Sequence, residues 1–172
     1  MLEKQFIKIS AEYNSTLDVN HFTVNGNMGA KVSISIYTLP LVLHDVNVTI
    51  KYELGNFNLA EIGFSVQTER KFSDFQLETK DHFSRLFRFN KDPWRIKGAD
   101  KFFISKIDAV LRQSSLTQLA IKTVFEPSII GNYENGTYSV KTRFSLAFDN
   151  KEDSLVPIIE FQKRMIRLLK NL

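Results

Sequence analysis

The sequence predicts an α+β domain: an antiparallel sheet of about five to seven strands, with two central helices and a C-terminal helix packed on it. Three observations lead to this fold class. Alternating apolar and polar residues recur in the first 70 residues, later regions have apolar residues at helical spacing, and an Asn-Gly pair precedes further alternation. Strands followed by helices favour one antiparallel sheet with helices packed on it over a doubly wound parallel sheet.

Three segments in the first part of the chain predict strands. Residues 32–36, 46–52 and 62–66 alternate apolar and polar side chains, so each should have one buried and one wet face. Glycine and asparagine tolerate turn conformations, and proline lacks a backbone donor. We therefore expect the chain to turn at Asn25-Gly26-Asn27, Leu39-Pro40 and Gly55-Asn56.

Two central helices are expected next. Thr79 is a candidate cap for the first, which should end near Asn90, and residues 101–113 should form the second after Asp100. Pro93 predicts a loop between them because proline disfavours helical geometry at the preceding residue. The expected buried faces consist of Phe83, Leu86 and Phe87 in the first helix, and Phe103, Ile107, Val110 and Leu111 in the second.

The end of the chain predicts a hairpin and a final helix. Asn135-Gly136 suits the positive φ angles of a type I′ turn, and clean alternation follows it. Ser154 is a candidate cap for a helix that has Pro157 near its first turn. The segment 116–125 is ambiguous between helix and strand. The final helix carries Ile158, Phe161, Met165, Ile166, Leu168 and Leu169 among its apolar residues.

Composition is that of an ordinary globular domain. Of the 172 residues, 43% are hydrophobic and 12% are aromatic, which is enough apolar surface for one core, so we expect a single domain over 1–172. The absence of cysteine excludes disulfides, thiolate metal sites and a cysteine nucleophile. We see no export signal or integral membrane segment and expect a cytoplasmic protein. A soluble fragment of a larger protein stays open as an alternative.

The net charge of +4 is unevenly distributed. Residues 80–106 contain eight basic and three acidic residues, and residues 158–172 contain four basic and one acidic. If both helical regions lie on one side of the sheet, they form a basic face that attracts phosphate. Trp94 lies among these cations and is either a stacking surface or a plug in the core. The candidate residues for binding an anion or partner are Arg85, Arg88, Lys91, Trp94, Arg95, Lys97, Arg164 and Arg167.

The sequence contains none of the common motifs for catalysis or nucleotide-cofactor binding. The chain has no Gly-x-Ser-x-Gly elbow, no Gly-x-x-x-x-Gly-Lys-Ser/Thr loop and no Gly-x-Gly-x-x-Gly. His21, His44 and His82 lack the spacing that directs two imidazoles at one metal. We therefore assign no catalytic, metal-binding or cofactor-binding residue, and we expect no cofactor.

These observations favour a non-catalytic binding or protein-interaction module, with a protein partner or a second copy of the chain as its ligand. Leu168, Leu169 and Leu172 are candidates for an exposed pairing surface. One alternative is an anion-binding domain that binds nucleic acid or an acidic membrane surface through basic helices 80–106 and 158–172. Another is an enzyme of an unfamiliar family, with a histidine beside a carboxylate in a pocket.

Overall fold

The computed structural model describes residues 1–25, 30–80 and 92–172. The first half of the chain forms one helix and four long strands, namely α1 (Leu2–Glu12), β1 (Asp18–Asn25), β2 (Lys31–Leu43), β3 (Val46–Leu54) and β4 (Leu59–Gln67). The second half forms β5 (Phe75–Thr79), β6 (Trp94–Gly98), α3 (Lys101–Arg112), α4 (Leu116–Lys122), β7 (Ser128–Glu134), β8 (Thr137–Ser145), a 3₁₀ turn (Lys151–Ser154) and α5 (Leu155–Asn171).

The strands belong to one antiparallel sheet with the order β1-β2-β3-β4-β8-β7-β5-β6. This confirms the predicted α+β class, but the eight strands exceed the expected five to seven. The unpredicted strands are β1, β5 and β6. The side chains of β1 are exposed at seven of eight positions, so its sequence has no alternation to detect. The five residues of β5 and of β6 are too few to establish a period.

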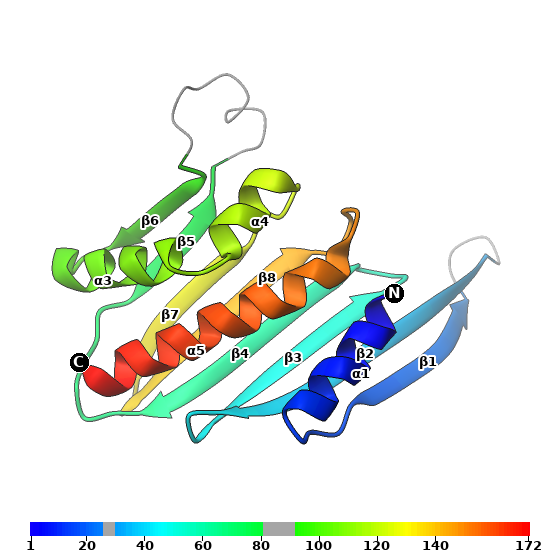
Figure 1. Cartoon of the computed structure of the whole chain (residues 1–172), viewed down its shortest axis with the longest axis horizontal. Coiled ribbons are helices and arrows are strands. Elements are labelled where there is room, and N and C mark those ends of the chain that lie inside the picture. Colours follow the sequence, from blue (N-terminus) through cyan, green and yellow to red (C-terminus); the bar gives the residue numbers. More distant parts are fainter. Residues whose placement is uncertain (26–29, 81–91) are drawn as a thin grey trace.

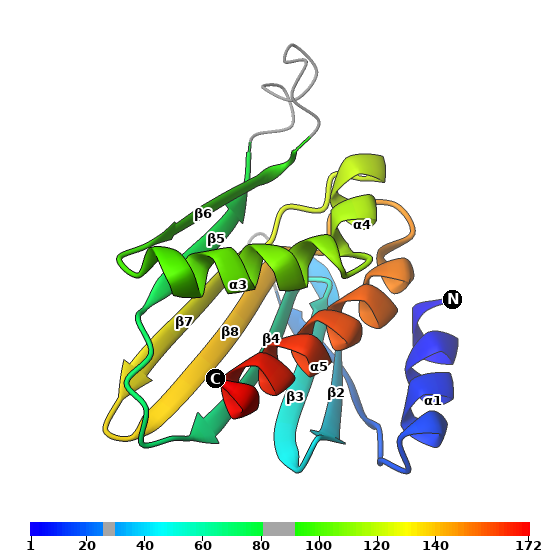
Figure 2. The ribbon, with the colours of Figure 1, turned by 60° about the vertical axis from the view of Figure 1, so that its left-hand side comes forward.

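The four described helices pack on one face of this sheet (Figures 1 and 2). Helix α5 lies along the middle strands, α1 lies beside β2, and α3 and α4 lie towards β5 and β6. Between these helices and the sheet is the hydrophobic core. No described helix covers the opposite face, which we call the open face.

Strand alternation assigns side chains to the two faces as predicted. On β3, Val48, Ile50 and Tyr52 are buried beneath the helices, whereas Asn47 and Thr49 are exposed on the open face. The register aligns Ile50 with Ile62 on β4, and Ile62 with Thr142 on β8. The buried face therefore continues from strand to strand.

We had expected a turn at Leu39-Pro40, but the chain does not turn there. Strand β2 continues through Pro40, and the turn follows at His44 and Asp45, whose φ angles are 50° and 62°. Proline is tolerated where a strand has a free side. Strand β1 pairs with β2 only as far as Thr38, so Pro40 has a sheet neighbour on the β3 side alone.

The C-terminal helix is confirmed, but Ser154 does not cap it through its side chain. The buried Ser154 hydroxyl donates to the carbonyl of Lys151 and lies 2.7 Å from the hydroxyl of Tyr52 on β3. Leu169 is buried, and Leu168 and Leu172 pack partly buried against the core. These three leucines therefore belong to the domain's own packing.

Helix α3 begins as predicted, because the carboxylate of Asp100 accepts a 3.0 Å hydrogen bond from the backbone N–H of Phe103. The ring of Phe103 stacks on Phe72 with 5.3 Å between centroids. The ambiguous segment 116–125 contains helix α4. The predicted hairpin at Asn135-Gly136 is confirmed, with φ angles of 49° and 79°.

Two further elements of the structure differ from the predictions made from the sequence. Helix α1 was not predicted, although Leu2, Phe6 and Ile9 have helical spacing and are buried. Strand β6 forms directly after Pro93, where a loop was expected, because it pairs with β5. Thr79 is the last residue of β5, and the first predicted central helix falls on residues outside the described ranges.

Candidate binding face

A row of alternating charges crosses the open face. Its side chains come from successive strands that the register places opposite one another. Opposite charges on neighbouring strands stabilise a sheet, and the alternation leaves the row close to neutral overall. From β3 to β6, this charged row consists of Lys51, Glu61, Arg143, Glu78 and Arg95, with the uncharged Ser128 of β7 between Arg143 and Glu78.

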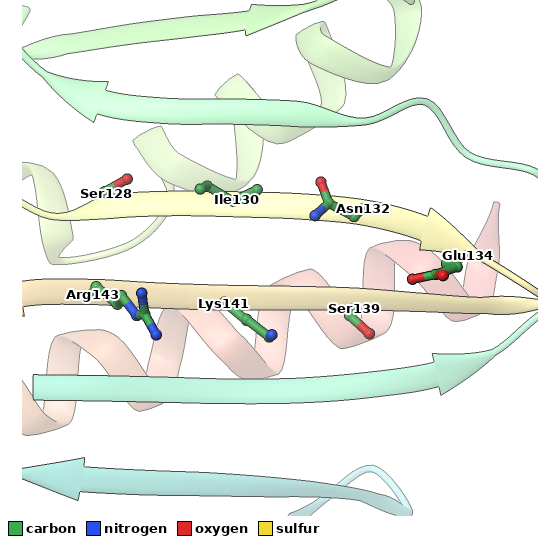
Figure 3. A pocket seen from close by; sticks show the side chains of 7 residues that line it. All are labelled: Ser128, Ile130, Asn132, Glu134, Ser139, Lys141 and Arg143. Carbon is green, nitrogen blue, oxygen red and sulfur yellow. The ribbon is translucent and has the colours of Figure 1, made fainter.

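Two shallow depressions adjoin on the open face, and Lys141 and Arg143 line both. Figure 3 shows the first, of about 250 Å³, whose side chains stand on β7, β8 and the end of their hairpin. It is lined by Ser128, Ile130, Asn132, Glu134, Ser139, Lys141 and Arg143. The second, of about 290 Å³, is lined by Thr49, Lys51, Glu61, Ile62, Gly63, Lys141, Thr142 and Arg143.

The three cations of these depressions differ in their partners. Arg143 is paired with Glu61, with 2.7 Å between Nη2 and Oε1. Lys51 and Lys141 have no ion pair or side-chain hydrogen bond within residues 1–25, 30–80 and 92–172. Two lysine ammonium groups on the open face are therefore available to an external anion.

Gly63 opens the floor of the second depression. It lies between Thr49 on β3 and Lys141 on β8. A Cβ atom at this position would meet only the carbonyl oxygen of Val140 at 3.6 Å and the Lys141 side chain at 3.9 Å. The missing side chain therefore leaves a gap on the open face, beside Lys141.

Of the residues predicted from the sequence to bind an anion or a partner, those that the structure describes do not all lie together. Arg85, Arg88 and Lys91 lie outside the described residues. Trp94 is buried, and its indole Nε1 donates a 3.0 Å hydrogen bond to Thr117 Oγ1, so it is a core side chain. Arg95 and Lys97 lie on the open face, where Lys97 Nζ is 3.8 Å from Glu78 Oε2.

Arg164 and Arg167 lie on the other side of the sheet, on α5. Arg164 is paired with Glu160, with 3.0 Å between Nη2 and Oε1, and Arg167 Nε donates to His44 Nε2 at 2.8 Å. With Lys106 of α3, both arginines line a groove of about 350 Å³. The structure therefore does not bring Arg95 and Lys97 together with Arg164 and Arg167 on one face.

Lys51, Lys141 and Arg143 were not predicted as a set from the sequence. Their positions on the polar side of predicted strands were visible, because each alternates with apolar neighbours. Residues 51 and 141 come to lie two strands apart because β4, in the first half of the chain, pairs with β8, in the second half. Local periodicity contains no signal for such a pairing.

The histidines and acids of the described residues do not form a metal site, since no group of three or more potential ligands is close enough to hold an ion. His21 Nδ1 lies 2.9 Å from the hydroxyl of Ser35, and His44 contacts Arg167. His82 is outside the described ranges. Neither described histidine lines the two depressions of the open face.

Comparison with known protein families, with curated proteins and with solved structures finds no match to this chain. Within the described residues, every helix is too short or too polar to span a membrane. The geometry of the open face is therefore the basis on which a function is proposed.

Proposed function

We propose that the protein is a non-catalytic binding module that receives an acidic segment of a partner protein on its open face. The observation that carries this proposal is the pair of adjoining depressions around Lys51 and Lys141, whose ammonium groups have no ion pair among the described residues. The helices bury the other face of the sheet, so these lysines are presented on the side that the domain leaves uncovered.

The spacing of the two lysines favours several carboxylates over one small anion. Lys51 and Lys141 are two strands and two residues apart, which corresponds to roughly 12 Å between Cα atoms. Carboxylates carried by separate residues of one segment match this separation. Arg143 lies two residues from Lys141 on β8 and in the same cross-strand row as Lys51, and its pairing with Glu61 limits its share in binding.

The lining of the depressions favours a polypeptide over single-stranded nucleic acid. Proteins that bind single strands stack bases on aromatic rings, and neither depression has an aromatic side chain in its lining. Hydroxyl and amide groups line the first depression instead, on Ser128, Asn132 and Ser139. Such groups donate to and accept from a peptide backbone.

A glutamate-rich peptide of about 20 residues is a direct probe, with affinity measured by calorimetry at low salt. We expect the variant Lys51→Glu/Lys141→Glu to bind at least about tenfold more weakly than the wild type, because both changes replace attraction with repulsion. The matched control is Lys122→Glu, an exposed lysine on α4 at the helical side of the sheet. Its affinity should stay within about twofold of the wild type.

Two results would overturn the proposal: no binding of the peptide by the wild type, or an equal loss of affinity in the Lys122→Glu control. A single-stranded oligonucleotide of matched charge provides the comparison with the anion-binding alternative. If it binds more tightly than the peptide, and Lys51→Glu/Lys141→Glu abolishes that binding, the partner class proposed here is wrong.

A further inference from the structure

The two edges of the sheet are protected to different degrees. Exposed edge strands tend to pair with other chains, and natural sheets discourage this with short strands and charged side chains. Strand β6 follows that pattern, since it has five residues and carries Arg95 and Lys97. It is therefore a protected edge.

Strand β1 has neither kind of protection. It has eight residues, its sole strand partner among the described residues is β2, and Figure 1 shows it at the outer end of the sheet. Asp18 at its first position is its one acidic residue, and it contains no lysine, arginine or proline. A long strand edge with nearly neutral side chains is thus open to pairing.

Apolar side chains accompany this edge on the open face. Phe22 is 45% exposed and Val24 is 38% exposed. The register places Phe22 opposite Ile34 and Val24 opposite Val32 on β2. Apolar surface therefore reaches the outermost strand, where a neighbouring strand would cover it.

We propose that two copies of the chain pair through β1, antiparallel and related by a two-fold axis, so that their sheets become continuous. A two-fold axis uses the same edge in both copies and closes the assembly. The resulting double sheet would end at two protected β6 edges. Because Asp18 stands at one end of β1, antiparallel pairing about the middle of the strand keeps the two Asp18 carboxylates apart.

Light scattering after size exclusion tests the assembly at several protein concentrations. We expect the wild type to be a dimer and Phe22→Lys to be a monomer over the same range. The matched control is Ile130→Lys, which places a lysine on the same open face at a similarly exposed position of the inner strand β7, and it should stay dimeric. Circular dichroism checks that each variant is folded.

Cysteine scanning can locate the contact, because the wild-type chain contains no cysteine. In a two-fold antiparallel pair, only residues near the axis lie opposite their own copy, at Cα separations that a disulfide spans. We expect single cysteines placed in turn along β1 to cross-link in a narrow window at its middle. A cysteine at Val42, an exposed open-face position beyond the β1 pairing, should not cross-link.

A wild type that is strictly monomeric at high concentration would overturn the β1 pairing, as would cross-linking spread evenly over the strand and Val42. Loss of the dimer in Ile130→Lys but not in Phe22→Lys would also contradict it. None of these results bears on the acidic-segment proposal, because Lys51 and Lys141 lie on inner strands of the sheet.

Discussion

Gln162 on α5 donates a hydrogen bond of 3.0 Å from Nε2 to Oγ1 of Thr142 on β8, and both side chains are buried. The other polar atom of the amide, Oε1, is buried without a partner among the described residues. The bond joins the C-terminal helix to the strand beneath it. Thr142 is also the polar member of an otherwise apolar buried row, between Ile62 and Ile129.

Removing one partner of the Gln162–Thr142 hydrogen bond should lower the free energy of unfolding more than removing both partners. We expect Thr142→Val to lower the free energy of unfolding by about 1–3 kcal/mol, because it leaves the Gln162 amide buried without this bond. Thr142→Val/Gln162→Leu should recover part of that loss. Urea unfolding of both single variants and the double variant measures the coupling, and strictly additive effects would contradict this account.

Two strand glycines should respond differently to alanine. A Cβ atom at Gly131 would lie 2.2 Å from the ring of Phe75 and 2.6 Å from the Tyr138 hydroxyl, so Gly131→Ala should destabilise the protein by about 1–3 kcal/mol through overpacking. Gly63→Ala faces ordinary contact distances and should retain near wild-type stability. Thermal unfolding of the two variants compares them directly, and equal melting temperatures would contradict the prediction.

Stability at alkaline pH should depend on Tyr52. Burial raises the pKa of Tyr52 above its ordinary value of 10.0, and the hydrogen bond with Ser154 only partly opposes this. The neutral ring is therefore favoured in the folded state. Its contribution to stability is present below pH 10 and is lost as pH rises towards the folded-state pKa.

We expect Tyr52→Phe to lose less stability than the wild type between about pH 9 and 11. At neutral pH the variant should be less stable by about 0.5–1.5 kcal/mol, because the hydrogen bond is absent. Thermal unfolding across this pH range measures both effects. Tyr13→Phe, which changes a partly exposed ring, is the control. Parallel pH curves for wild type and Tyr52→Phe would contradict the prediction.

Glu160, in contrast to Tyr52, should make a contribution to stability that is lost at acidic pH. Partial burial raises its pKa, but hydrogen bonds from Ser115 and Arg164 outweigh burial and leave the pKa below its ordinary value of 4.5. The carboxylate is thus favoured in the folded state. Its contribution is present above pH 4.5 and is lost as pH falls through the lower folded-state value.

The variant Glu160→Gln should therefore be less stable than the wild type at neutral pH, and the difference should shrink as pH falls below 4.5. Urea unfolding at a series of acidic pH values is the appropriate measurement. Glu12→Gln, at an exposed position of α1, serves as the control. A difference for Glu160→Gln that is constant over the whole range would contradict this assignment.

Much of the fold was predictable from local pattern. The alternation in residues 46–52 predicted β3, Asn135-Gly136 predicted the hairpin, and Asp100 predicted the start of α3. Strand β1 was not predictable in this way, because a strand exposed on nearly all sides imposes no period on its sequence. The turn predicted at Pro40 was wrong because the tolerance of proline in β2 depends on where the neighbouring strand β1 begins.

The candidate site was less predictable than the fold. Lys51 and Lys141 are visible as polar residues of strands, but their proximity depends on the pairing of β4 with β8. Arg95 and Arg164 were grouped by charge along the chain, and the structure places them on opposite faces of the sheet. Local charge counts contain no information about which side of a sheet a residue reaches.

By itself, the sequence determined the α+β class, the positions of several amphipathic elements and the absence of cysteine chemistry. These properties follow from residues near one another in the chain, whose spacing sets which side chains share a face. Only the tertiary structure decided that Trp94 is buried, that the lysines of two distant strands share one open face, and that β1 is at one end of the strand order. Each of these depends on contacts between residues far apart in sequence, which local spacing does not encode.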